Sequence, residues 1–363
     1  MAEQAVKMKK RKKKMSKKKK LLIALLIVVI LVVIACITAV AVIFHYIGKV
    51  EVEDPKKAFP IVDSVYDDDL TSEPDSPPEV IEKADKKIDE NLAKKATEIM
   101  SDDNVINVLL IGTDSRSNDD RGRSDSMILV SLNKNTKQVI MTSFLRDIYC
   151  NIPDIENTRL NHAYAYGGPD LLIRTLESNF KVRIDRYVRV NFYTFCDVVD
   201  AVGGVDIDVT DEEVPYVNSY LGEINSLEGY DRADGQLTHA GKQTLNGRQA
   251  LAYSRIRYIG TDFARTQRQR TVLEDIIRKM KGLSLGELSD LLDVLLPKLA
   301  TNMTEGEMFS FVVDSPVYLK YKVIQNRIPA DGTWSFMTVR QMSVIDVNFD
   351  ENIEELRKTI YGK

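Results

Sequence analysis

The stretch VINVLLIGTDSR, residues 105–116, indicates the fold of this chain. Its first seven residues are apolar except for Asn107, as in a buried strand, and Gly112 follows them. Strand-like and helix-like runs alternate in the sequence that follows. We predict strands over 127–132, 137–143, 188–192 and 205–209, and helices over 170–180 and near 193–202. This alternation predicts an α/β domain over residues 102–281, with a mixed central β-sheet covered by α-helices.

Charge is distributed unevenly along the chain. Residues 1–20 contain eleven Lys or Arg and one acid, Glu3, whereas the whole chain has a net charge of −4. No charged residue occurs from Leu21 to Phe44, and a helix of that length spans roughly 36 Å, more than the ~30 Å of a bilayer core. We expect a transmembrane helix over 21–47. The lysines before it place the N-terminus in the cytoplasm, and they indicate topology rather than nucleic-acid binding.

Two segments connect this predicted membrane helix to the α/β domain. Residues 48–78 are rich in acids and proline, and such a composition buries too little apolar surface to offset chain entropy. We therefore expect an extended extracytoplasmic stalk. Residues 79–101 have the apolar spacing of an amphipathic helix, which either docks on the domain or pairs with another chain. At the other end, we expect residues 282–363 to form a helical extension packed on the α/β domain.

Arginines are concentrated in SRIRYIGTDFARTQRQR, residues 254–270. Residues 253–258 are predicted as a strand, in which Arg255 and Arg257 share a face. The predicted helix that follows presents a second polar face, made of Arg265, Arg268 and Gln269. Two such faces across one turn would bind a pyrophosphate, because guanidinium groups hold phosphate oxygens in pairs. The alternative is a solvated basic patch.

Two aspartates stand next to predicted strands at the start of the domain. Asp114 follows the strand at 105–111, and Asp125 precedes the next strand. Carboxylates at strand ends, beside hydroxyls and glycine, are typical ligands of Mg²⁺ or Mn²⁺, and the two could share one ion. Capping or turn aspartates are the alternative. Arg146 stands where a further predicted strand ends.

The remaining reactive side chains give weaker signals. Cys150 and Cys196 lie in the part expected outside the membrane, either as a disulfide or as two buried free thiols. Neither has a histidine signature nearby, so neither is expected to be a nucleophile. We interpret His162 as a structural hydrogen-bonding residue.

Several linked motifs resemble those of the LytR-CpsA-Psr family of membrane-anchored cell-wall enzymes. They extend over residues 107–273, and the basic head and single span fit the usual arrangement of that family. The motifs are LLIGTDSR (109–116), RSDSMILVSLN (123–133), FLRDIYCNIP (144–153), LNHAYAYGG (160–168), VNFYTFCDVVDAVGGVDIDV (190–209), QTLNGRQALAYSRIRY (243–258) and DFARTQRQR (262–270). One departure is Phe144-Leu145 before Arg146, where the family commonly has a proline.

The resemblance implies a function. Members of the family are understood to move glycopolymers, such as teichoic acids or capsular polysaccharides, from an undecaprenyl pyrophosphate carrier to N-acetylmuramic acid of peptidoglycan. This implies a protein of the plasma membrane of a Gram-positive bacterium, with its catalytic domain outside the cell. Two other classes remain open, namely a polyprenyl pyrophosphate phosphohydrolase and a non-catalytic envelope regulator or binding protein.

The resemblance also implies roles for single residues. It makes Asp114 and Asp125 the carboxylates of a Mg²⁺ site. It gives pyrophosphate binding to Arg146, Arg255, Arg257, Arg265 and Gln269, with Arg116 and Arg123 as weaker candidates. The polyprenyl tail is expected in an apolar tunnel between sheet and helices.

Catalysis follows from the charge that develops during phosphoryl transfer. Prearranged guanidinium groups stabilise negative charge on the phosphate oxygens, so Arg146, Arg255 and Arg257 are expected to act in catalysis as well. Arginine is a poor proton acceptor, and we therefore expect a carboxylate, Asp262 or Asp125, to be the general base.

Overall fold

The computed structural model describes residues 38–54, 59–62, 70–93, 99–113, 122–257 and 259–362. The chain divides into two compact units, Met1–Tyr46 and Ile47–Lys363. In the first unit residues 38–46 are helical, and residues 21–37 of the predicted transmembrane helix lie outside the described residues. No helix in the described part of the chain combines the length and the apolar character needed to cross a bilayer.

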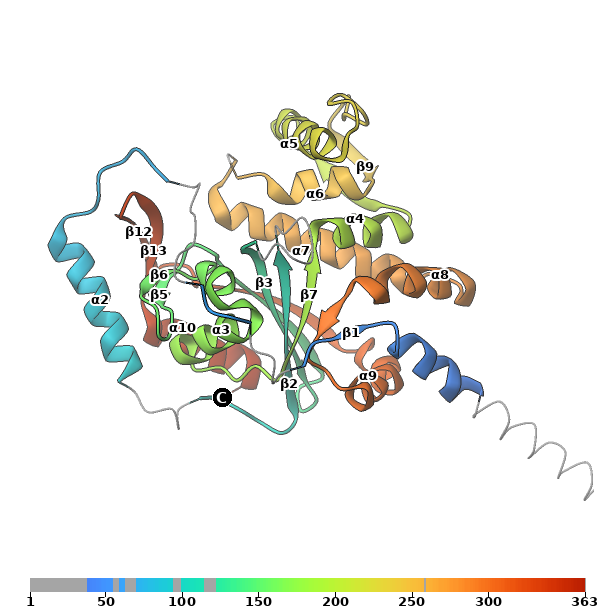
Figure 1. Ribbon diagram of the computed structural model, residues 1–363, viewed down its shortest axis with the longest axis horizontal. Coiled ribbons are helices and arrows are strands. Elements are labelled where there is room, and N and C mark those ends of the chain that lie inside the picture. Colours follow the sequence, from blue (N-terminus) through green and yellow to red (C-terminus); the bar gives the residue numbers. More distant parts are fainter. Residues whose placement is uncertain are drawn as a thin grey trace, which may run out of the picture. The chain divides into compact units, whose positions relative to one another are not determined.

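The described residues of the second unit form a seven-stranded sheet (Figure 1). Its strands are β1 (Glu51–Val52), β2 (Val105–Thr113), β3 (Ser124–Asn133), β4 (Gln138–Phe144), β7 (Arg186–Asn191), β10 (Ala300–Thr301) and β11 (Lys322–Ile328). Their order is β1-β10-β7-β2-β3-β4-β11. β2 is parallel to β7 and antiparallel to β3, while β4 is antiparallel to β3 and parallel to β11. The sheet is therefore mixed, as predicted.

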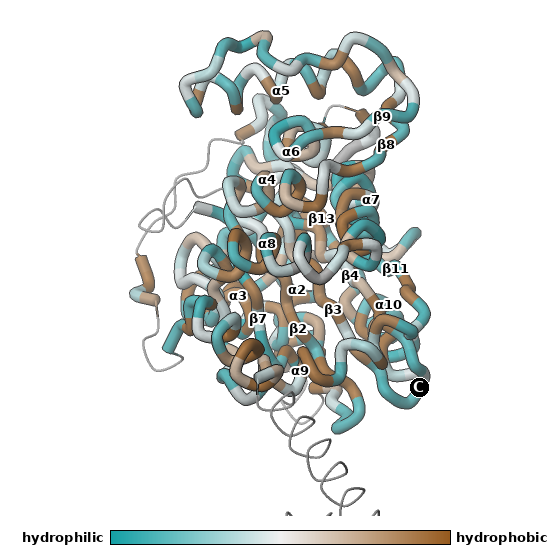
Figure 2. The backbone as a smooth tube through the Cα atoms, turned by 90° about the vertical axis from the view of Figure 1, so that its right-hand side faces the viewer, coloured by the Kyte–Doolittle hydropathy of each residue, from teal (hydrophilic) through white to brown (hydrophobic). Residues whose placement is uncertain are grey.

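On the left in Figure 1, α3 (His162–Phe180) packs against this sheet, and α2 (Pro78–Leu92) and α10 (Phe349–Leu356) pack against α3. Their inward residues, such as Leu172 and Ile353, join Leu109 and Leu129 of the sheet in one large core. In Figure 2 much of β2, β3 and β7 is brown, the colour of hydrophobic residues. Burial of apolar surface, at roughly 25 cal/mol per Å², is the main force that holds these layers together.

A second core is enclosed by elements that lie above the strand ends in Figure 1. The elements around it are α4 (Phe192–Ala201), α5 (Glu213–Glu228), α6 (Gly247–Arg255), α7 (Thr261–Met280) and the antiparallel ribbon of β8 (Val205–Val209) and β9 (Gly241–Leu245). Val199, Leu221 and Val272 are buried in it. The Asn191 side chain accepts a hydrogen bond from the backbone N–H of Thr194 and so caps α4. This layer of helices therefore starts directly at the end of β7.

The described residues of segment 48–78 do not form the free stalk that composition predicts. β1 pairs with β10 and joins the sheet. Glu53 forms an ion pair of 2.6 Å with Arg189, and the backbone N–H of Val62 donates to the carbonyl of Tyr166. Proline and acid content predict the extended conformation of a segment that has no tertiary contacts. Here a strand pairing and a partly buried ion pair fix the segment to the domain.

The helix predicted over 79–101 is present but shorter, because α2 ends at Leu92. Ala84 and Ile88, one turn apart, are buried in the large core. Lys86 on the outer side is exposed. Of the two alternatives left open by the sequence, docking on the domain is the one that the structure shows.

Segment 282–363 is not the helical extension that its sequence predicts. It contains α8 (Leu285–Leu295), α9 (Glu305–Tyr318) and α10, but also β10, β11 and the antiparallel ribbon of β12 (Trp334–Val339) and β13 (Met342–Val347). β11 pairs with β4 from Lys322 opposite Gln138 to Ile328 opposite Phe144. Because β4 and β11 are far apart in the sequence, no local sequence pattern predicts that they pair. The domain boundary predicted at residue 281 therefore falls inside one folded unit.

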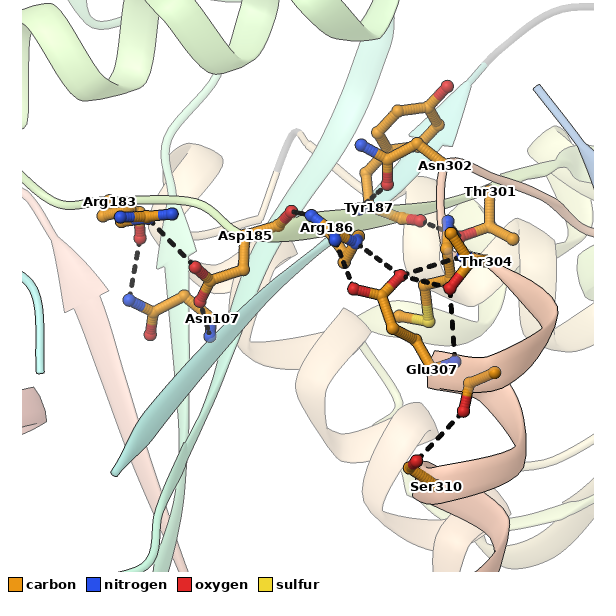
Figure 3. Close-up of polar contacts among 12 residues, drawn as sticks. Asn107, Arg183, Asp185, Arg186, Tyr187, Thr301, Asn302, Thr304, Glu307 and Ser310 are labelled. Carbon is orange, nitrogen blue, oxygen red and sulfur yellow. Dashed lines mark hydrogen bonds and ion pairs between the residues drawn. The ribbon is translucent and has the colours of Figure 1, made fainter. Parts of the chain in front are cut away.

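Polar contacts hold α9 at the starting end of β7 (Figure 3). Arg186 of β7 donates to both carboxylate oxygens of Glu307, which also accepts from the N–H and hydroxyl of Thr304. The Thr301 hydroxyl donates to the carbonyl of Tyr187. The remaining short elements are β5 (Tyr149–Asn151), β6 (Asn157–Arg159), η2 (Leu296–Lys298) and η3 (Arg357–Tyr361).

Candidate functional site

A cavity of about 350 Å³ lies where the ends of β2 and β7 and the start of β3 meet α4, α5, α6 and α7. Its lining combines two kinds of side chain. The apolar part includes Leu110, Ile128, Phe195, Leu227, Leu251 and Leu273. The polar part includes Arg123, Asp125, Arg255, Arg257, Arg265 and Gln269. Apolar walls with a few convergent polar groups are typical of a ligand-binding site.

The polar residues reach the cavity from three different parts of the chain. Arg123 and Asp125 come from the start of β3. Arg255 is the last residue of α6, and Arg257 stands in the loop after it. Arg265 and Gln269 lie one turn apart on α7. The structure thus places six of the predicted site residues around one cavity.

The strand predicted over 253–258 is wrong. α6 continues through this stretch to Arg255, because a capping box at Asn246 starts the helix and no turn residue interrupts it. Ile256 then leaves the helical conformation, with φ −59° and ψ 121°. Arg255 and Arg257 therefore share no strand face. Both still line the cavity, one from the helix end and the other from the loop.

The Arg255 guanidinium lies against two aromatic rings of the cavity wall. Its central carbon is 5.3 Å from the ring centroid of Phe192 and 5.3 Å from that of Tyr220. Both distances are within the range of cation–π attraction. The rings restrict the orientation of the guanidinium plane, as two-pronged binding of a phosphate requires.

Asp125 is the acidic residue at the centre of the polar lining. Its carboxylate accepts a hydrogen bond of 2.7 Å from Arg146, and Arg265 donates to its backbone carbonyl at 3.4 Å. Burial acts to raise the pKa of this carboxyl, but the positive charges of Arg146, Arg265 and Arg123 outweigh burial and lower the pKa to about 2. Asp125 is therefore ionised at neutral pH, and a carboxylate with so low a pKa is a poor general base.

Arg146 stands behind Asp125 and is not among the described residues that line the cavity. Its side chain is only 4% exposed, and its Nε lies 3.5 Å from Asp147. Asp147 in turn lies 3.6 Å from Arg159. The guanidinium contacts the partly buried carboxylates of Asp125 and Asp147, and the direct pyrophosphate contact expected for Arg146 stays a prediction. Its hydrogen bond to Asp125 and its positive charge both lower the pKa of that carboxyl.

Three predicted site residues have side chains outside the described part of the structure. Asp114 and Arg116 lie outside the described residues. Asp262 belongs to the first turn of α7, but its side chain is outside the described part. Within the described part, no group of three or more His, Cys, Asp or Glu side chains could hold a metal ion. The ionised carboxylate of Asp125 is nevertheless an oxygen donor of the kind that Mg²⁺ favours, so it fits one contact to a divalent ion.

The spacing of Arg268 predicts that it shares a face with Arg265. In the structure Arg268 instead pairs with another side chain and is not among the described residues that line the cavity. It is buried and forms an ion pair of 2.7 Å with Glu213. It also donates to the backbone carbonyls of Ile256 and Ile259. These carbonyls belong to the loop that carries Arg257, so the buried guanidinium fixes that loop. Spacing alone cannot show that a carboxylate on α5 faces this side of α7.

Two hydroxyl groups at the cavity were not predicted. Thr113 ends β2 and Ser254 is the last residue but one of α6, and both are buried. In the described part of the chain neither hydroxyl has a hydrogen-bond partner, although both residues line the cavity. A buried polar group without a partner costs about 1–3 kcal/mol, so both are suited to bind a polar group of a ligand. Serine and threonine are too common for the sequence to single them out.

The other reactive residues lie away from the cavity lining. The Nδ1 atom of His162 is 3.2 Å from the Thr158 hydroxyl, and the ring is buried. Cys150 and Cys196 are both free thiols and both buried, which decides between the two alternatives that the sequence left open. Burial raises the pKa of Cys150, and it raises the pKa of Cys196 to about 12. Neither thiol is therefore a nucleophile at neutral pH.

The sequence matches known proteins over most of the second unit. A profile of the LytR_cpsA_psr family matches residues 78–358. The polyisoprenyl-teichoic acid–peptidoglycan teichoic acid transferase TagU of Bacillus licheniformis is 34% identical over 249 residues, which are 67% of this chain and 75% of the relative. TagU of Bacillus mycoides is 35% identical over 236 residues, which are 62% of this chain and 69% of the relative.

Solved structures show the same architecture. TagT bound to LIIa-WTA has a TM-score of 0.58 and 28% identity, covering 74% of this chain and 96% of that chain. The protein YwtF (TagT) with a bound octaprenyl pyrophosphate lipid has a TM-score of 0.54 and 27% identity, covering 72% of this chain and 93% of that chain. The profile match, the sequence identity and the fold agree, and the chain belongs to the LytR-CpsA-Psr family.

Proposed function

We propose that this protein is a phosphotransferase that moves a glycopolymer from an undecaprenyl pyrophosphate carrier to N-acetylmuramic acid of peptidoglycan. The polymer would be a teichoic acid, a capsular polysaccharide or a related chain. The cavity is the observation that carries the proposal, because it combines apolar walls with a cluster of arginines. The relatives named as teichoic acid transferases support it.

A polyprenyl pyrophosphate has two chemically different parts, and the cavity has a counterpart for each. Among the described lining residues, four arginines face two carboxylates, Asp125 and Glu228. Asp125 is already neutralised by Arg146, so a net positive charge is left for a diphosphate. The prenyl chain would bury its surface against the apolar walls, at roughly 25 cal/mol per Å². The octaprenyl pyrophosphate bound to the related YwtF supports this assignment.

In the proposed reaction the acceptor hydroxyl oxygen attacks the phosphorus that carries the glycopolymer. A P–O bond to the acceptor forms, the bond to the bridging oxygen of the pyrophosphate breaks, and the carrier leaves as polyprenyl monophosphate. Negative charge grows on the non-bridging oxygens and on the leaving phosphate. Arg255, Arg257 and Arg265 would stabilise that charge, because their guanidinium groups are in place before the reaction.

The proton of the attacking hydroxyl needs an acceptor. Of the two carboxylates expected for this role, Asp125 is a weak base, since its pKa is about 2. We therefore assign the role to Asp262, in the first turn of α7. A Mg²⁺ or Mn²⁺ ion, when bound, would neutralise further charge on the pyrophosphate. Asp125 and Asp114 would hold that ion.

We also propose that residues 21–47 anchor the chain in the plasma membrane of a Gram-positive bacterium. The lysine-rich segment 1–20 and the uncharged run that follows support a cytoplasmic N-terminus. An enzyme that acts on peptidoglycan must also face the cell wall. Protease added to intact protoplasts should therefore degrade the chain beyond about residue 50. Cleavage of segment 1–20 alone would show the opposite orientation.

The function is tested by following the transferred phosphate. The full-length protein is incubated with a synthetic polyprenyl-pyrophosphoryl sugar and peptidoglycan oligomers, with and without Mg²⁺. The expected product is a sugar joined to muramic acid by a phosphodiester, with one polyprenyl phosphate released for each bond formed. Release of free sugar phosphate without use of the acceptor would indicate a hydrolase. Donor binding without any turnover would indicate a binding or regulatory protein.

A further inference from the structure

A row of aromatic side chains joins α7 to the β12–β13 ribbon. The ring of Phe263 packs on Trp334, with 4.4 Å between centroids and an interplanar angle of 31°. Trp334 meets Phe336 edge to face at 5.0 Å. The Arg327 guanidinium carbon lies 4.3 Å from the Phe263 ring. We call Phe263, Trp334 and Phe336 the aromatic row.

This row starts beside the proposed pyrophosphate site. Phe263 directly follows Asp262 in the chain and precedes Arg265 by two residues. Residues two apart in a helix are separated by roughly 5–6 Å between Cα atoms. Arg265 lines the cavity and donates to the carbonyl of Asp125. Side chains two apart in a helix point to nearly opposite sides, so the aromatic row and the Arg265 side of the cavity lie on either side of the start of α7, where Asp262 also stands.

Packing of the core explains only part of the row. Phe263 and Trp334 are partly buried and pack against the large core, as residues that attach a ribbon to a helix should. Phe336, however, is 53% exposed. The Phe336 ring extends the row into solvent as an exposed aromatic surface, and such surfaces can bind a partner.

A polar cleft of about 190 Å³ borders the same tryptophan. Its lining includes Trp334, Ser335, Asp346, Asn348 and Glu351. Hydroxyl, amide and carboxylate groups are the hydrogen-bonding partners that sugar hydroxyls need. Lys87 is the basic residue among the described lining residues, and it is paired with Asp346 at 2.5 Å. The cleft is therefore slightly acidic, which fits the hydroxyl and acetamido donors of a sugar.

We propose that the aromatic row and this cleft bind the acceptor glycan, a linear chain of pyranose sugars; this inference rests on the proposed function. The C–H groups on one face of a pyranose ring pack on aromatic rings, while its hydroxyl and acetamido groups form hydrogen bonds at the edges. An aromatic surface beside planar polar side chains matches that chemistry. A polyol-phosphate chain lacks such ring faces. The glycan would thus lie with one muramic acid hydroxyl at the start of α7.

The test uses the fact that Trp334 is the one tryptophan of the 363-residue sequence. Its fluorescence reports on the aromatic row in the full-length protein. Oligosaccharides of alternating N-acetylglucosamine and N-acetylmuramic acid, added without lipid donor, should change the Trp334 emission in a saturable way. Phe336→Ala should raise the half-saturating concentration roughly tenfold, as the loss of one stacking ring predicts. Leu319→Ala is the matched control, because Leu319 is 54% exposed and belongs to neither feature. It should bind as the unmodified protein does.

The transfer assay adds a second readout. Phe336→Ala should raise KM for the acceptor by the same factor and leave KM for the lipid donor unchanged. Equal glycan binding by Phe336→Ala and Leu319→Ala, or an emission that does not respond to saturating glycan, would overturn the inference even if transfer proceeds. A response to a glycerol-phosphate polymer and none to glycan would also overturn it. Glycan binding at Trp334 without transfer to any acceptor would leave the glycan site in place and reject the proposed function.

Discussion

Arg146 donates a hydrogen bond of 2.7 Å to Asp125, and the two side chains differ in position: the arginine is 4% exposed, whereas the carboxylate reaches the cavity. The contacts continue from Arg146 through Asp147 to Arg159, so charges of opposite sign alternate in a line behind the cavity. A buried ion pair adds little net stability, but removing one partner leaves an uncompensated charge. The pair therefore matters most for the charge state of Asp125.

Arg146→Ala should destabilise the fold by about 3 kcal/mol. This loss of stability is at the low end of the range for a buried ion pair, because the charges of Arg265 and Arg123 still stabilise the Asp125 carboxylate. Arg174→Ala is the control, since Arg174 forms an exposed pair of 2.6 Å with Asp154 and should change stability by less than about 1 kcal/mol. Urea unfolding of both variants measures the difference. Equal losses would show that the Arg146 pair behaves as a surface pair.

Asp125→Asn should alter the dependence of stability on acid. The pKa of Asp125 is about 2 in the folded protein, below its ordinary value of 3.8. A lowered pKa contributes stability that is fully present above the unfolded value and is lost as pH falls through the folded value. On going from roughly pH 5 to pH 2, the unmodified protein should lose about 2 kcal/mol more than the variant. Parallel unfolding curves for the two proteins over that range would contradict the lowered pKa.

The buried pair of Arg268 and Glu213 gives a third prediction. Arg268→Ala should destabilise the fold by about 3–5 kcal/mol, because it leaves the Glu213 carboxylate buried without its partner. Combining Arg268→Met with Glu213→Gln removes both charges and should recover most of that loss. Thermal unfolding of the single and double variants measures the coupling. Losses that simply add would mean that the two side chains act independently.

Local patterns predicted much of the fold and the group of residues at the cavity. The runs at 105–111 and 127–132 are strands because their apolar residues extend through a buried sheet. The strand predicted over 253–258 is wrong because, over only six residues, arginines two apart fit a strand and a helix end equally well. The pairing of β11 with β4 is a tertiary contact that no local pattern carries.

The partners of buried charges were equally hidden in the sequence. An arginine at a strand end looks the same in the sequence whether it binds a ligand or a carboxylate of the protein. The fold brings Arg146 to Asp125. The composition of segment 48–78, rich in acids and proline, predicts a free stalk. Composition cannot show that Glu53 forms an ion pair with Arg189 of the sheet.

Arg255→Lys and Arg257→Lys should each reduce turnover by at least roughly tenfold, about 1.4 kcal/mol of transition-state stabilisation. A lysine keeps the charge but cannot hold two phosphate oxygens at once, and it cannot present a planar face to Phe192. Arg270 is unsuitable as a control because it is buried and donates to Gln325. Arg174→Lys is suitable, because Arg174 is exposed and is not among the described lining residues.

The most direct measurement is the rate at which these three lysine variants and the unmodified protein transfer a sugar phosphate from polyprenyl pyrophosphate to peptidoglycan oligomers, at low and at high salt. The two cavity variants should be slower by at least roughly tenfold at both salt concentrations, while Arg174→Lys keeps the rate of the unmodified protein. Equal rates for all four proteins, falling together as salt rises, would contradict a pyrophosphate site built from Arg255 and Arg257.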